Sequence, residues 1–176
     1  MTILSAAGDA DYVGEPVSQQ QHALQCAYFA QKAGAPAAAV AAALLHDIGH
    51  LQAPPDAQHM ANLGILGHEK YGSDFLRELG FAEKVCALVQ GHVQAKRYLV
   101  YKNKAYFDRL SEASRQTLGF QGGPMSDDEA VRFEADPLFK IKLAVREWDE
   151  RAKVPELEVP GLASYNQLLL GQMTAD

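Results

Sequence analysis

Histidine and aspartate residues are the side chains of this sequence best suited to chemistry. Six histidines occur among the 176 residues. Two of them, His46 and His50, flank Asp47 within ALLHDIGH, at the end of an apolar run. Burying a carboxylate in such a run is costly unless a cation compensates its charge. A metal ion is the simplest such cation, and imidazole together with carboxylate suits zinc, iron or manganese.

An ordered set of these residues is a stronger signal than any one member. A single histidine on a helix is usually an ordinary polar residue, and His59, in a polar segment, is interpreted in that way. The other candidates follow one another along the chain, each on an expected helix or at its end. We therefore predict a metal site from six residues: His22, His46, Asp47, His68, His92 and Asp149.

The elements that must position these residues are helices, because the sequence has helical periodicity and no strand-like alternation. We expect helices over residues 18–33 (capped by Ser18), 37–49, 68–79, 82–100, 105–118, 126–136 (opened by a Ser126–Glu129 capping box) and 137–152, with Pro137 in the first turn. Residues 51–66 hold two prolines and a glycine, and predict a long loop of functional importance. The pattern predicts a single all-α domain over residues 1–176.

Composition narrows the class of protein further. The formal net charge is −6, which argues against general binding to nucleic acid or to an anionic membrane surface. Cys26 and Cys86 form neither a CxxC pair nor a disulfide framework, as expected for a reducing compartment. No apolar run is long enough to span a membrane, and no signal peptide is visible. We expect a cytoplasmic protein.

Several segments resemble a known family. His22, ALLHDIGH and the late Asp149 are similar to the H…HD…D pattern of the HD-domain superfamily, whose commonest members are phosphohydrolases. Longer segments, among them HEKYGSDFLRELGF, GHVQAKRYL and SEASRQTLGFQGGPM, resemble the PhnZ-type HD-domain diiron oxygenases, which are relatives of myo-inositol oxygenase. The resemblance covers about residues 10–150. It implies a helical HD-domain bundle with a dinuclear metal site in its core, and an enzyme of phosphonate catabolism that cleaves a C–P bond with dioxygen.

The resemblance also implies the cofactor and its ligands. Two iron ions, Fe(II) and Fe(III), would share Asp47 as a bridge. One iron would be bound by His22, His46, Asp47 and Asp149, and the other by Asp47, His68 and His92. A carboxylate has two oxygens and can bridge two cations, whereas a neutral imidazole binds one.

Six further residues are candidates for contact with substrate. Lys96 lies four residues after His92 and Arg146 three before Asp149, so each shares a helical face with a ligand and suits a phosphonate dianion. Ser114 offers a hydroxyl to the same group. The resemblance implies that Tyr12 can occupy an iron site and swing away, that Glu15 pairs with a substrate ammonium, and that His50 contacts substrate. Ordinary surface, loop or helix-end roles are the alternative for each.

The substrate is the least determined part of this interpretation. A well-known family member is rich in aromatic residues where this chain has Met60, Leu63, Ile65 and Leu66. Aliphatic side chains would leave room for three methyl groups, which favours 1-hydroxy-2-(trimethylammonio)ethylphosphonate, cleaved to glycine betaine and phosphate. The close alternative is 2-amino-1-hydroxyethylphosphonate, cleaved to glycine and phosphate. An HD-type metal-dependent phosphohydrolase is the second candidate enzyme, and a non-catalytic metal-binding module the third.

Overall fold

The structure is a computed structural model that describes Leu4, Tyr12 and residues 14–173. Five helices form the centre of the molecule: α2 (Gln19–Lys32), α3 (Ala37–Leu45), α5 (His68–Glu78), α6 (Glu83–Lys102) and α10 (Phe139–Arg151). Helix α6 packs against α3, α5 and α10, while α2 packs against α3 and α10. The all-α prediction is confirmed, since the described residues contain no strand, only isolated bridges.

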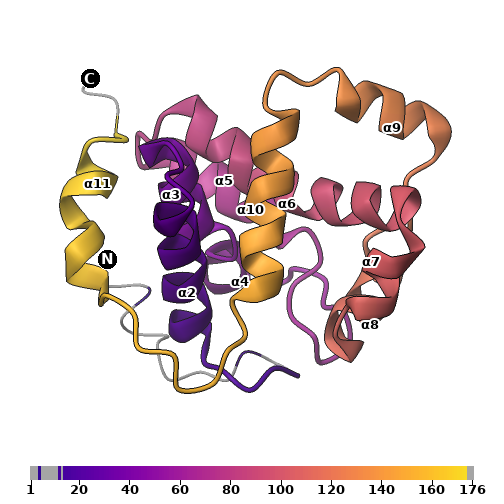
Figure 1. Ribbon diagram of the computed structural model, residues 1–176, viewed down its shortest axis with the longest axis horizontal. Coiled ribbons are helices and arrows are strands. Elements are labelled where there is room, and N and C mark those ends of the chain that lie inside the picture. The colour runs from indigo at the N-terminus through magenta and orange to yellow at the C-terminus, as the bar shows by residue number, and fades with distance from the viewer. Residues whose placement is uncertain (1–3, 5–11, 13, 174–176) are drawn as a thin grey trace.

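The remaining helices are short and lie around this bundle (Figure 1). Helices α7 (Lys104–Arg109), α8 (Glu112–Phe120) and α9 (Asp127–Glu134) lie on one side of it, and α11 (Asn166–Leu170), preceded by the 3-10 helix η1 (Leu162–Tyr165), lies on the other beside α3. The four-residue helix α4 (Gly49–Gln52) packs against α5. None of the described helices combines the length and apolar character needed to cross a membrane.

The alanine-rich helix α3 is the centre of the core. Every residue of α3 after Ala37 is buried. Small side chains let neighbouring helices approach closely, and this brings α2 and α6 against α3. The predicted Ser18 cap and the predicted Ser126–Glu129 capping box are both present, and at the start of α2 Gln21 completes a second capping box with Ser18.

The helix predicted over residues 37–49 is shorter than expected. It ends at Leu45, residues 46–48 form a turn, and α4 begins at Gly49. After the turn, α4 approaches α5 so closely that a Cβ atom on Gly49 would lie 1.9 Å from the carbonyl oxygen of His68. His46 and Asp47 therefore lie in a turn, where neighbouring side chains can reach a common centre more easily than on one helix.

Two other boundaries were also predicted wrongly. The helix expected over 105–118 is two helices, because Asn103 and Ser111 each accept hydrogen bonds from the backbone of the following turn and start separate helices there. Pro137 precedes α10 rather than lying in its first turn. The Asp136 side chain accepts a hydrogen bond from the Leu138 N–H, at 2.7 Å, just before the helix begins.

Candidate metal centre

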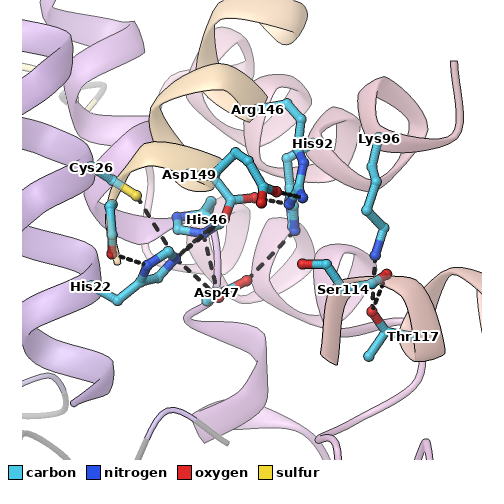
Figure 2. Close-up of polar contacts among 12 residues, drawn as sticks. His22, Cys26, His46, Asp47, His92, Lys96, Ser114, Thr117, Arg146 and Asp149 are labelled. Atoms are coloured by element: carbon cyan, nitrogen blue, oxygen red, sulfur yellow. Dashed lines mark hydrogen bonds and ion pairs between the residues drawn. The ribbon is translucent and has the colours of Figure 1, made fainter. Parts of the chain in front are cut away.

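The six predicted metal-binding residues converge from five parts of the fold. His22 comes from α2, the pair His46 and Asp47 from the turn after α3, His68 from the first residue of α5, His92 from α6 and Asp149 from α10. Figure 2 shows five of these side chains pointing toward one another. All four histidines and Asp149 are buried.

Asp47 lies between two pairs of imidazole nitrogens. In the first pair, the Nε2 atoms of His22 and His46 are 3.1 Å apart. In the second, the Nε2 atoms of His68 and His92 are 3.0 Å apart. Asp47 directs Oδ2 to the first pair, 3.3 Å from His46 Nε2, and Oδ1 to the second, 3.3 Å from His68 Nε2 and 3.5 Å from His92 Nε2.

Backbone carbonyls fix the hydrogen on each of these rings. The Nδ1 atoms of His22, His46, His68 and His92 lie 2.7–3.1 Å from the carbonyl oxygens of Ala152, Ala43, Ile65 and Val89. A carbonyl only accepts, so each Nδ1 donates its hydrogen, and in the neutral ring Nε2 then carries the lone pair that a metal ion binds. Lone pairs and carboxylate oxygens therefore face one another in both groups, and such an arrangement requires positive charge.

The spacing of these atoms fits metal ions. Two ligand atoms bound about 2.1 Å from a metal ion, in directions at right angles, lie about 3.0 Å apart. The Nε2 atoms within each histidine pair have that spacing. Asp149 Oδ1 is buried without a hydrogen-bond partner, 3.4 Å from His22 Nε2, and faces the first pair. Two cations, one in each group, would satisfy these atoms.

The charges of the centre favour binding of cations as well. Burial acts to raise the pKa of Asp47, but His46 and His68 hold it well below the ordinary value. Burial also acts against ionisation of Asp149, and Arg146 with His46 holds its pKa well below the usual range. Burial lowers the pKa of His46, yet Asp47 and Asp149 together raise it to about 9. The two carboxylates thus attract positive charge strongly.

A cavity of about 200 Å³ opens beside the centre. Asp47, His68, His92 and Asp149 form part of its wall. All six residues predicted to contact substrate also line it: Tyr12, Glu15, His50, Lys96, Ser114 and Arg146. The geometry therefore brings both predicted groups of residues to one site.

Lys96 and Arg146 place positive charge in this cavity in different ways. Lys96 is buried on α6, and its ammonium donates to Thr117 Oγ1 at 3.0 Å. In the described part of the chain no carboxylate lies within ion-pair distance of that ammonium. Burial and the charge of Arg146 lower the pKa of Lys96 to about 7. Arg146, in contrast, is already paired with Asp149 and Glu150, and donates to the Tyr106 hydroxyl oxygen at 2.8 Å.

Tyr12 and His50 contact predicted metal-binding residues directly. The Tyr12 hydroxyl donates to Asp47 Oδ2 at 3.0 Å, and its ring stacks on His22 at 4.2 Å between centroids. His50 stacks on His68 at 4.0 Å, and its Nδ1 accepts from the Ile65 N–H at 3.1 Å. Gly64, at φ +102°, makes room for this ring, since a Cβ atom there would lie 2.7 Å from it.

Glu15 and Ser114 have a partner that the sequence analysis did not single out. Lys153, just after α10, lies 2.8 Å from Glu15 Oε1 and donates to Ser114 Oγ at 3.2 Å. Thr117 and Cys26 were missed as well. The Cys26 thiol, one helical turn after His22, lies 3.8 Å from His22 Nε2 and belongs to a possible metal-binding group with His22 and His46. Their spacing from predicted site residues on the same helical face was the available signal.

The loop before α5 contributes an apolar wall. Met60, Leu63 and Ile65 line the cavity as the aliphatic pattern suggested, whereas Leu66 does not. His59, interpreted as an ordinary polar residue, is exposed and lies at the rim of the same cavity.

Comparison with known proteins assigns the chain to a family. The family model described as "HD domain" matches residues 20–138. The chain is 40% identical over 158 residues to a (1-hydroxy-2-(trimethylamino)ethyl)phosphonate dioxygenase (glycine-betaine-forming) of Leisingera caerulea, covering 90% of this chain and 80% of that protein. It is 40% identical over 156 residues to a hydroxymethylphosphonate dioxygenase of Gimesia maris, covering 88% and 77%. An uncharacterised protein of Acanthamoeba polyphaga mimivirus is 41% identical over 164 residues, covering 93% and 75%. The chain belongs to the HD-domain family and, within it, to the group of oxygen-using enzymes that includes these phosphonate dioxygenases.

Proposed function

We propose that this protein uses two iron ions and dioxygen to cleave the C–P bond of a small 1-hydroxyphosphonate, releasing phosphate and a carboxylate. The observation that carries this proposal is Asp47, which turns one oxygen toward each of two histidine pairs. A dinuclear site of nitrogen and oxygen ligands suits iron, and histidine–carboxylate sites with open positions are typical of non-haem iron oxygenases.

The ligand assignment follows the two groups of atoms. His22, His46, Asp47 Oδ2 and Asp149 would hold one iron, and Asp47 Oδ1, His68 and His92 the other. When bound, the two irons would supply the redox chemistry with dioxygen. The carbonyl contacts to the four Nδ1 atoms hold the imidazoles in the orientation that binding requires.

The phosphonate end of the substrate would lie against Lys96, Arg146 and Ser114. Lys96 is the best candidate among them, because its buried ammonium has a hydroxyl partner but no ion-pair partner among the described residues. A phosphonate dianion would give it one, and the charge-assisted hydrogen bond would hold the substrate in place. Arg146 can orient the same group while it keeps Asp149 in position.

The hydroxyl-bearing carbon would lie toward the metal centre. Tyr12 donates to Asp47 Oδ2 and stacks on His22, so it covers the first group of ligands and would move when substrate binds there. His50 accepts the Ile65 N–H at Nδ1, which leaves its Nε2–H as a donor toward a substrate oxygen. Burial and the neighbouring His68 lower the pKa of His50 to about 3, so the His50 ring stays neutral.

The far end of the substrate would lie near Glu15 and the aliphatic residues Met60, Leu63 and Ile65. The sequence favours a trimethylammonium or a primary ammonium group at this end of the substrate. The products would be glycine betaine or glycine, respectively, together with phosphate.

The test is turnover of these hydroxyphosphonates with and without dioxygen. For the protein loaded with iron, we expect one phosphate and one carboxylate for each dioxygen consumed, which balances the atoms of the reaction. Asp47→Ala, as the inactive reference, should release no phosphate. Equal phosphate release under strict anaerobiosis would refute the oxygenase proposal and favour the hydrolytic chemistry of other HD-domain enzymes.

A further inference from the structure

Glu15 already has an ammonium partner within the chain. Lys153 Nζ lies 2.8 Å from Glu15 Oε1, and the Ser111 hydroxyl donates to the same oxygen at 2.5 Å. The side chain of Glu15 is 7% exposed and that of Lys153 is 11% exposed. Because water hardly screens this ion pair, it is stronger than the usual pair at a protein surface.

Lys153 is itself held firmly behind the cavity wall. Its ammonium lies 3.2 Å from Ser114 Oγ, 3.3 Å from Ser111 Oγ and 3.5 Å from Glu150 Oε1. Glu15 and Ser114 line the cavity, whereas Lys153 lies outside its lining. The preceding residue, Ala152, offers its carbonyl to His22 Nδ1, which fixes the backbone at this point.

This pair changes what the far end of the cavity can bind. A lone carboxylate would attract a cationic group, but Glu15 and Lys153 together carry no net charge. A substrate ammonium must compete with Lys153 for Glu15 and lies near a like charge, which disfavours binding. An uncharged group does not compete with Lys153 for Glu15 and is not repelled by the Lys153 charge. The two named relatives do not decide between these cases, since one is named for a trimethylamino substrate and the other for hydroxymethylphosphonate.

We propose that Lys153 is a specificity-determining residue that occupies Glu15 and so favours small hydroxyphosphonates with an uncharged far end over those with an ammonium. The proposal rests on the proposed function, because it concerns the substrate of the same cavity. Lys153 does not contact substrate in this scheme. It acts through Glu15, as a positioning residue.

The test compares two ligands by equilibrium binding to the iron-loaded protein without dioxygen. One is hydroxymethylphosphonate and the other is 2-amino-1-hydroxyethylphosphonate, which adds an ammonium. In Lys153→Met we expect the affinity ratio of the amino compound to the uncharged one to rise about 10- to 150-fold, the range of one charge-assisted contact. The substitution could also change binding of the phosphonate group through Glu150 and Arg146. Both compounds carry this group, so such a change cancels in the affinity ratio.

Two variants control for other effects of the substitution. Lys153→Arg keeps the cation and should keep the wild-type ratio. Lys142→Met removes a buried lysine of α10 that pairs with Asp136 at 2.6 Å and does not line the cavity. It should leave the ratio unchanged. If Lys153→Met does not fold, Lys153→Gln replaces it in the same comparison.

The outcomes separate this inference from the proposed function. Suppose that the wild-type protein binds both compounds and that the affinity ratio in Lys153→Met stays within twofold of the wild-type ratio. This result overturns the role of Lys153 and leaves the proposed function intact. A ratio that falls in Lys153→Met overturns that role too. Wild-type protein that binds neither phosphonate overturns the proposed function, and this inference with it.

Discussion

Replacing Lys96 by methionine should make the protein more stable and less able to bind a phosphonate. The Lys96 side chain is buried, its ammonium donates to Thr117 Oγ1, and among the described residues no carboxylate forms an ion pair with it. Burying an ammonium in this way costs free energy, because desolvation disfavours its charged form. Methionine has a similar length and no charge, so Lys96→Met removes the cost and keeps most of the packing.

The pKa of Lys96 gives the size of this effect. Burial, followed by the charge of Arg146, lowers it from 10.5 to about 7 in the folded protein. The difference, 10.5 − 7, is about 3.5, which corresponds to about 5 kcal/mol at about 1.4 kcal/mol for each pKa unit. Water that enters the cavity solvates part of the charge, so we expect a gain of about 2–4 kcal/mol for Lys96→Met at pH 7.

The dependence on pH has a definite sign. Between pH 7 and 10.5 the unfolded chain holds a proton on Lys96 that the folded protein does not, so the stability contributed by this group rises with pH. The full cost of burial is present below pH 7 and vanishes above pH 10.5. The advantage of Lys96→Met in the free energy of unfolding should therefore be largest near pH 7 and shrink toward pH 10.

The assay is urea unfolding of metal-free wild type and variant at several pH values, together with phosphonate binding to the iron-loaded proteins. Binding should weaken about 10- to 150-fold in Lys96→Met. Lys142→Met serves as the control, because its ammonium is paired with Asp136 and its loss should destabilise the protein. A Lys96→Met variant that is less stable at pH 7, or whose gain does not depend on pH, would refute this reasoning.

Other predictions concern the metal centre and the packing around it. Asp47→Ala should lose both irons in metal analysis, and retention of one full equivalent would show that Asp47 does not bridge; His59→Ala should leave the iron content unchanged. Arg146→Ala should weaken phosphonate binding about 10- to 150-fold and lower stability by about 3–5 kcal/mol, because it removes the cation paired with Asp149 and leaves Glu150 with Lys153 alone. Normal thermal unfolding and binding in that variant would contradict both roles of Arg146. Gly49→Ala should lower the melting temperature markedly, since the added methyl group would meet the His68 carbonyl oxygen, and an unchanged melting temperature would contradict the close approach of α4 and α5.

Helical spacing explains why much of the site was predictable. Lys96 follows His92 by one turn, and Arg146 precedes Asp149 by one turn, so each had to share a face with a candidate ligand. The structure brings all of them to one cavity. The capping boxes at Ser18 and Ser126 were predictable for the same reason, since they involve residues three apart. The single-domain assignment of residues 1–176 stays a prediction.

Features set by contacts between distant segments were not predictable in this way. The apolar run 37–49 has no stop signal of its own before Gly49, yet α3 ends at Leu45, and Gly49 lies against the backbone of α5 in a contact that the local sequence does not show. The split of residues 105–118 had local signals, since Asn103 and Ser111 both cap helices, but the periodicity of the apolar residues concealed them.

The charge pattern at the end of α10 shows what a sequence can still reveal at such a place. Arg146 pairs with Asp149 and Glu150, and Glu150 in turn faces Lys153, so charges of alternating sign follow one another at helical spacing. Each of these charged groups lies within about one turn of the candidate ligand Asp149. Lys153 was therefore a candidate for the site from its spacing alone, whereas its partner Glu15, far away in the chain, required the fold. Charged residues one turn from a metal ligand belong to the electrostatics of the site, even where they do not touch the metal or the substrate.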